Sequence, residues 1–126
     1  MTSRIDVDPA LEPRDTLVAD AIRGVLRVRA LGPRLGTAGA DLLMGWVFDE
    51  RRFNASPLVL DLGAVDILST AVIGALVQIA SHRRLRLVGV RRSVRLMFDT
   101  RGLRSFFETS ESMDAAVEEL AGGLED

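Results

Sequence analysis

The stretch Leu58–Leu76, LVLDLGAVDILSTAVIGAL, decides the fold of this chain. It opens with a nearly continuous apolar run bounded by Pro57 and Gly63, which is typical of a strand covered on both faces. A short turn follows, and the residues after Ser69 and Thr70 are apolar with helical spacing. The stretch therefore predicts a buried strand, a turn, and a helix that begins at two adjacent hydroxyl side chains.

The segments on either side predict further strands and helices. Strands are expected at Leu17–Ile22, Val25–Leu31 and Leu85–Val90, a short extended piece at Leu103–Phe107, and helices at Ala38–Phe48, Thr70–Ser81, Ser93–Thr100 and Met113–Leu120. Thr37 is expected to cap the first helix, and Gly102 to stop the third. The order ββαβαβα(β)α predicts a single α/β domain, with a mixed, mostly parallel sheet flanked by about four helices.

Length and composition set further limits. A chain of 126 residues fits one domain, which we place at residues 17–121, after a loose arm at 1–16 and before a tail at 122–126. The chain has no cysteine and one histidine, so disulfides and a multi-histidine metal site are excluded. No stretch resembles a signal peptide or a membrane span, and a net charge of −2 gives no reason to expect nucleic-acid binding. We therefore expect a cytoplasmic protein without nucleic-acid or membrane partners.

Candidate chemical sites favour structural roles. Gly32–Gly39 precedes a helix as a phosphate loop does, but it lacks the Gly-Lys-Ser/Thr ending, and every basic residue of the chain is arginine. Asp61 and Asp66 bracket the turn, where Asp66 is well placed to accept backbone hydrogen bonds. His82 is expected to end a helix, and Trp46 to lie in the core. Because no catalytic set converges, we expect a protein that is not an enzyme and has no cofactor.

Charge is distributed unevenly towards the C-terminus. Arg83–Arg104 holds eight arginines and one acid, whereas Glu108–Asp126 holds seven acids and no base. The two segments either solvate neighbouring faces and partly neutralise each other, or form a basic surface that docks an acidic partner.

The hydroxyls of Ser69 and Thr70 allow two interpretations, a helix cap or a site of phosphorylation. A Ser or Thr at a helix N-terminus commonly caps the helix by accepting a backbone hydrogen bond. The same position tolerates an added phosphate, because free N–H groups and the helix dipole favour negative charge there.

Several motifs together resemble the STAS domains, the family of anti-sigma-factor antagonists. They are Val59-Leu-Asp-Leu, Val65–Leu76, Leu85-Arg-Leu-Val-Gly and Gly102-Leu-Arg-Ser-Phe-Phe, and the resemblance extends over about residues 17–121. It implies a sheet flanked by helices and a non-enzymatic switch. In such a switch, a partner kinase phosphorylates a Ser or Thr at the start of the second helix and a phosphatase reverses the change.

The resemblance places the phosphoacceptor at Thr70, with Ser69 as a rival, in a variant that reads Leu-Ser-Thr-Ala where the family usually has Asp-Ser-Ser-Gly. It implies an anti-sigma factor or related protein kinase as partner, together with a serine/threonine phosphatase. We expect the partner-binding residues to be Asp66, Ser69, Thr70 and Ile73. The alternative is a constitutive scaffold that assembles homo-oligomers or a signalling complex without phosphorylation; a homodimer is left open.

Overall fold

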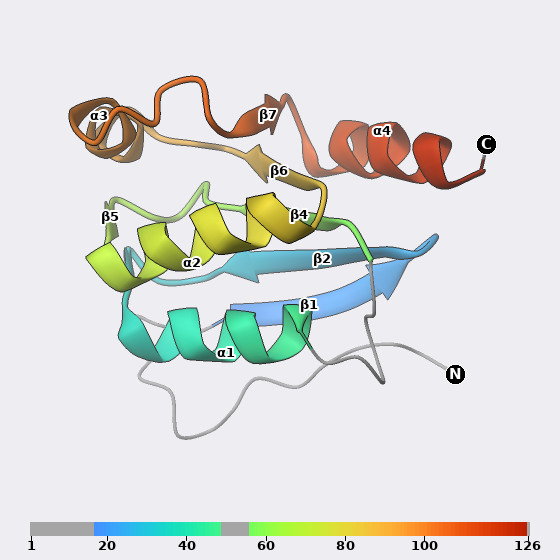
Figure 1. The fold of residues 1–126 in the computed structure, drawn as a ribbon, viewed down its shortest axis with the longest axis horizontal. Helices are drawn as coiled ribbons and strands as arrows, with labels where there is room; N and C mark the ends of the chain where they lie inside the picture. The colour runs from blue at the N-terminus through green and yellow to red at the C-terminus, as the bar shows by residue number, and fades with distance from the viewer. Residues whose placement is uncertain (1–16, 49–55, 126) are drawn as a thin grey trace.

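The computed structural model of the protein describes residues 17–48 and 56–125 (Figure 1). The predicted arm at 1–16 lies outside these residues. The elements in chain order are β1 (Leu17–Ile22), β2 (Val25–Ala30), β3 (Arg34–Leu35), α1 (Thr37–Val47), β4 (Leu58–Asp61), β5 (Ile67–Leu68), α2 (Thr70–His82), β6 (Leu85–Val88), α3 (Arg92–Thr100), β7 (Glu108–Ser110) and α4 (Met113–Glu125). None of these helices is both long enough and apolar enough to cross a membrane.

The main sheet has five strands in the order β1-β2-β4-β6-β7. Strands β1 and β2 are antiparallel, and the pairs β2–β4, β4–β6 and β6–β7 are parallel. Since helical connections separate the parallel strands, the sheet is mixed and mostly parallel. This confirms the predicted fold class.

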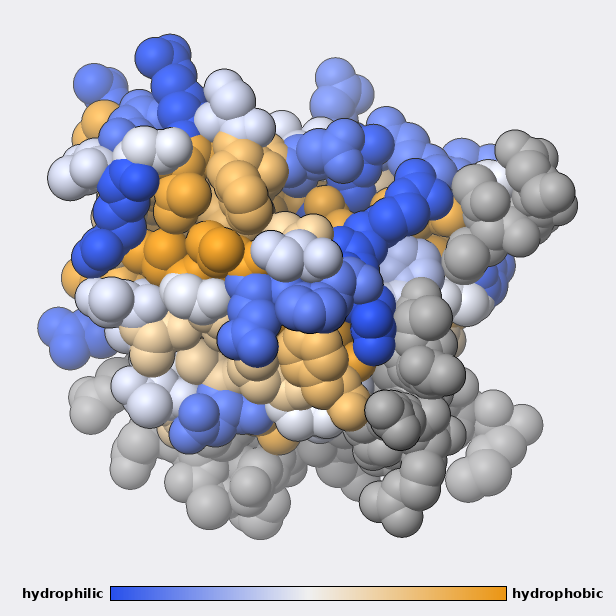
Figure 2. All heavy atoms as spheres, viewed as in Figure 1, coloured by the Kyte–Doolittle hydropathy of each residue, from blue (hydrophilic) through white to orange (hydrophobic). Residues whose placement is uncertain are grey.

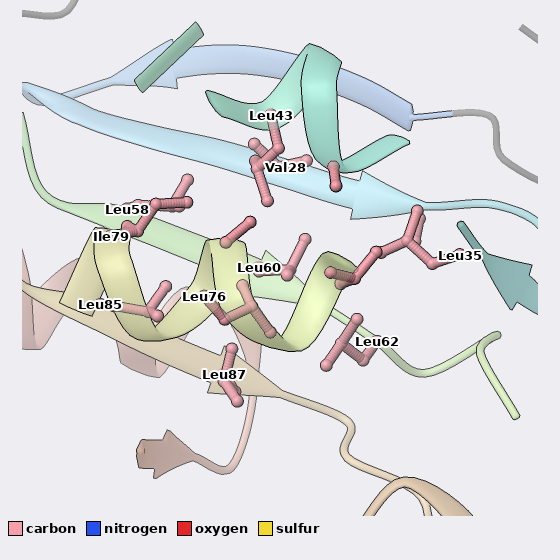
Figure 3. Close-up of a cluster of buried hydrophobic side chains, with 14 of the residues drawn as sticks. Val28, Leu35, Leu43, Leu58, Leu60, Leu62, Leu76, Ile79, Leu85 and Leu87 are labelled. Atoms are coloured by element: carbon pink, nitrogen blue, oxygen red, sulfur yellow. The ribbon is translucent and has the colours of Figure 1, made fainter. Parts of the chain in front are cut away.

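Helices cover the sheet on both faces (Figure 1). Leu58 and Leu60 of β4 join the cluster that contains Leu43 of α1 and Leu76 of α2 (Figure 3). Val59, which points to the opposite face, joins the smaller cluster beneath α4. The central strand is therefore apolar at consecutive positions because both of its faces are covered, as its sequence predicts.

Several predicted boundaries are wrong. The residues before β7 form turns rather than the extended piece expected at Leu103–Phe107, and Phe106 N donates to the Leu103 carbonyl over 3.1 Å. Thr37 is the first residue of α1 rather than its cap; the N-cap is Gly36, which has no side chain to accept the bond. Helix α4 continues to Glu125, beyond its predicted end at Leu120. The predicted stop after α3 is confirmed, since Gly102 adopts φ +71° and donates to the Asp99 carbonyl.

Gly89, just after β6, packs against the backbone that follows β4. Its φ is +69°, and a Cβ built there would lie 2.9 Å from Gly63 Cα. We expect Gly89→Ala to destabilise the domain by at least about 1–3 kcal/mol, because it adds backbone strain and a clash with main-chain atoms. Urea unfolding measures this difference.

Gly74→Ala is the control for that variant. Gly74 lies inside α2, and a Cβ there would meet nothing within 4 Å. Alanine should stabilise this position by roughly 0.5–1 kcal/mol, since it lowers the conformational entropy of the unfolded chain. The packing argument fails if both variants shift stability in the same direction.

Candidate functional site

The candidate site begins where β4 ends. Asp61 Oδ1 accepts a hydrogen bond from Gly63 N at 2.8 Å, and Leu62 N donates to the Val88 carbonyl at 2.8 Å. These contacts fix the start of the turn that leads to α2. The turn-stabilising role expected of Asp66 therefore belongs to Asp61.

The segment before α2 is held by backbone hydrogen bonds to the loop Gly32–Gly39, which the sequence analysis compared with a phosphate loop. Asp66 N and Ile67 N both donate to the Pro33 carbonyl, at 2.7 and 3.1 Å, and Ser69 N donates to the Leu35 carbonyl at 2.9 Å. Strands β3 and β5 form a parallel pair there. The loop thus presents carbonyl oxygens to the site, whereas a phosphate loop must present N–H groups. This supports the structural role that the sequence favoured.

Ser69 is the N-cap of α2. Its Oγ accepts a hydrogen bond from Val72 N at 3.2 Å, and its backbone is extended. The side chain is half-buried. For Ser69, the capping interpretation is confirmed.

The hydroxyl of Thr70 lies in a different environment from that of Ser69. It is the first residue of α2, and it is exposed. Its Oγ1 accepts a hydrogen bond from Arg101 Nη2 at 3.3 Å, on the protein surface. The hydroxyl of Thr70 therefore lies outside the capping interaction and beside a guanidinium from the end of α3.

Of the expected partner-binding residues, Asp66 forms a surface ion pair and Ile73 is buried. The Asp66 carboxylate accepts from Arg91 Nη1 at 2.6 Å, which ties the turn before α2 to the start of α3. Both side chains are half-exposed, so this pair contributes on the order of 0–1 kcal/mol. Ile73 is only 4% exposed and belongs to the main core. Its assignment to the partner-binding surface is wrong, because the apolar face of α2 packs inward.

Three residues beside this site were missed. Ile67 of β5 is 49% exposed, and Arg91 and Arg101 reach the site from the two ends of α3. We define the α2-entrance surface as Asp66, Ile67, Thr70, Arg91 and Arg101. Figure 2 shows apolar side chains at the surface between α2 and α3, bordered by hydrophilic ones. No periodic signal in the sequence marks Ile67, because β5 has only two residues.

The surroundings of Trp46 and His82 fit the structural roles expected of them. Trp46 is buried in the core, as predicted. His82 ends α2, and its Nδ1 lies 2.9 Å from the Gln78 carbonyl. Within residues 17–48 and 56–125, no group of three His, Cys, Asp or Glu side chains is arranged to hold a metal ion.

The two charged segments meet at Arg86. Its guanidinium lies 3.6 Å from Glu108 and 3.8 Å from Glu119. In contrast, Arg92 and Arg95 of α3 have no ion-pair partner among the residues that the structure describes. The segments therefore neutralise each other only in part, and the outer side of α3 stays basic.

The Ser69 cap gives a direct stability prediction. Ser69→Ala should lower the free energy of unfolding by roughly 0.5–2 kcal/mol, because Val72 N loses its acceptor. Thr70→Ala is the matched control, and it should stay within about 0.5 kcal/mol of the parent protein since Thr70 is exposed. Equal losses in urea unfolding would mean that the two hydroxyls do not have separate roles.

Comparison with models of known protein families assigns the chain to a family. The model of the STAS domain matches residues 16–116, which covers most of the protein. The chain belongs to the STAS domain family, and its site occupies the strand–turn–helix segment that suggested the resemblance. No curated protein matches the sequence.

Solved structures share this fold at low sequence identity. An anti-sigma factor antagonist from Mycobacterium paratuberculosis is 20% identical with a TM-score of 0.66, over 87% of this chain and 98% of that one. A sulfate transporter family protein from Wolinella succinogenes is 18% identical with a TM-score of 0.65, over 82% and 89%. The anti-sigma factor antagonist SpoIIAA, solved in its unphosphorylated form, is 10% identical with a TM-score of 0.61, over 82% and 94%. The chain is thus similar in fold to anti-sigma-factor antagonists and to a transporter-family protein.

Proposed function

We propose that the protein is a non-enzymatic binding module that captures an anti-sigma factor or a related protein kinase, and that phosphorylation of Thr70 releases this partner. One observation carries the proposal: Thr70 offers an exposed hydroxyl at the start of α2, and this hydroxyl does not cap the helix. The α2-entrance surface is the docking site in this proposal. A serine/threonine phosphatase would restore the binding form.

The two hydroxyls are not equivalent as phosphate acceptors. A phosphate on Ser69 would disturb the bond from Val72 N and would have to fit a half-buried position. A phosphate on Thr70 would stand at the helix N-terminus near Arg101, where the dipole and a charge-assisted hydrogen bond both favour it. Thr70 is therefore the acceptor in the proposal.

The same phosphate opposes docking. It adds roughly −1.5 to −2 charge units at neutral pH. Ile67, half-exposed on β5, supplies apolar area that a partner would bury beside Thr70. Burying the phosphate against that partner would require its desolvation, so binding weakens while the domain stays folded.

The fold similarity to anti-sigma factor antagonists supports this class of partner, and the proposal places the protein in the cytoplasm of a bacterium. It requires no cofactor, nucleic acid or membrane. The Leu-Ser-Thr-Ala variant changes the residues that enter α2, so the proposal requires a kinase that recognises this altered entrance.

Fragmentation mass spectrometry of protein isolated from its own cells tests the proposal. Arginine-specific cleavage releases the peptide Phe53–Arg83, which holds Ser56, Ser69, Thr70 and Ser81. Fragment ions should place a phosphate on Thr70 under at least one growth or stress condition. A phosphate confined to Ser69 would reverse the choice of acceptor.

A constitutive scaffold is the second candidate, and the cap supports it, since Ser69 completes the start of α2 without any phosphate. In that case no phosphate should be found under any condition. Light scattering should instead give an oligomer whose mass does not change with protein concentration. Phosphate on Thr70 together with a monomer would exclude the scaffold.

A further inference from the structure

A cavity of about 240 Å³ lies between β6, α3 and the segment that enters β7. None of its lining residues belongs to the α2-entrance surface. Its apolar wall includes the buried side chains of Leu87, Phe98 and Phe107. The Phe98 and Phe107 rings are 4.9 Å apart between centroids, and Phe107 also meets Phe106 edge-on at 5.0 Å. These aromatic contacts hold the wall in place before anything binds.

Two arginines add charge to this cavity. Arg95 comes from α3, and it has no ion-pair partner among the residues that the structure describes. Arg104 comes from the segment before β7; it is 82% exposed, and its nearest carboxylate, on Asp99, is 3.9 Å away. Both guanidinium groups therefore keep donors for another anion. Ser105 and Thr109 add hydroxyls to the lining.

We propose that this cavity binds a small aromatic anion, with a carboxylate or phosphate ester attached to one or two rings. The size fits, because a cavity of roughly 150 Å³ accepts benzene and drug-sized ligands need roughly 300–1,000 Å³. The rings would contact the small accessible parts of Phe98 and Phe107, which are 5% and 8% exposed, and the anionic head would accept hydrogen bonds from Arg95 and Arg104. This inference is independent of phosphorylation at Thr70.

Titration with 2-naphthoate, followed by two-dimensional amide NMR, tests the proposal. Chemical-shift changes should concentrate on α3, β6 and the segment between Leu103 and Thr109. A Kd of about 1 mM is expected, given the modest binding energy per atom of a ligand this small. Absence of saturable shifts up to about 10 mM would overturn the proposal.

Two matched controls distinguish specific binding in this cavity from nonspecific electrostatic attraction to the surface. The neutral 2-naphthamide should bind at least about 5-fold more weakly, because it cannot accept charge-assisted hydrogen bonds. Arg95→Gln and Arg104→Gln should each weaken 2-naphthoate binding about 5-fold. Arg92→Gln removes an exposed arginine of the same helix outside the cavity, so it should leave the Kd within about 2-fold. The proposal is overturned if the amide binds equally well or if Arg92→Gln weakens binding as much as Arg95→Gln.

Discussion

Thr70→Glu is expected to weaken binding of the proposed anti-sigma partner at least 10-fold, equivalent to about 1.4 kcal/mol. The carboxylate places a fixed negative charge at the start of α2, beside the half-exposed Ile67 that the partner would cover. Docking must then desolvate that charge. Isothermal titration calorimetry with a partner co-purified from the protein's own cells measures the change.

Thr70→Gln is the matched control, because it has the shape of glutamate without the charge. It should retain most of the affinity, and both variants should unfold near the parent midpoint since position 70 is exposed. If glutamine weakens binding as much as glutamate, bulk rather than charge would be responsible. If neither Thr70→Glu nor Ser69→Glu changes the affinity, the switch does not exist.

Leu60→Ala is expected to have the largest effect on stability. Leu60 is fully buried on the central strand β4, between the residues of α1 and α2 that close the main core (Figure 3). Truncation removes buried methyl groups and leaves a cavity in an environment that can collapse only partly. The loss should be roughly 2–5 kcal/mol in urea unfolding.

Ile67→Ala controls for the removal of aliphatic volume as such. Ile67 lies on β5 and is 49% exposed, so this variant should change stability by only about 0.5–1 kcal/mol. It should nevertheless weaken partner binding if the α2-entrance surface is the docking site. Similar stability losses for Leu60→Ala and Ile67→Ala would contradict the assignment of β4 to the centre of the core.

The main architecture could be predicted because its signals are local. The apolar run Leu58–Leu62 and the helical spacing after Thr70 each extend over enough residues for a period to be recognised. The cap at Ser69 could be predicted for the same reason, since the donor Val72 N lies only three residues further along the chain. These features needed no knowledge of tertiary contacts.

The features that were missed depend on partners distant in sequence. Strands β3 and β5 have two residues each, too few to show a period, and they exist because they pair with each other. Asp66 meets Arg91, 25 positions away, and Thr70 meets Arg101, 31 positions away. Ile73 was expected on the partner-binding surface, but its helical phase turns it into the core.

The most direct measurement compares unmodified protein with protein carrying phosphothreonine at position 70, titrated against the same anti-sigma partner. The unmodified form should bind, and the phosphorylated form should bind at least about 10-fold more weakly with an unchanged unfolding midpoint. Equal affinity of the two forms would contradict phosphorylation control at Thr70.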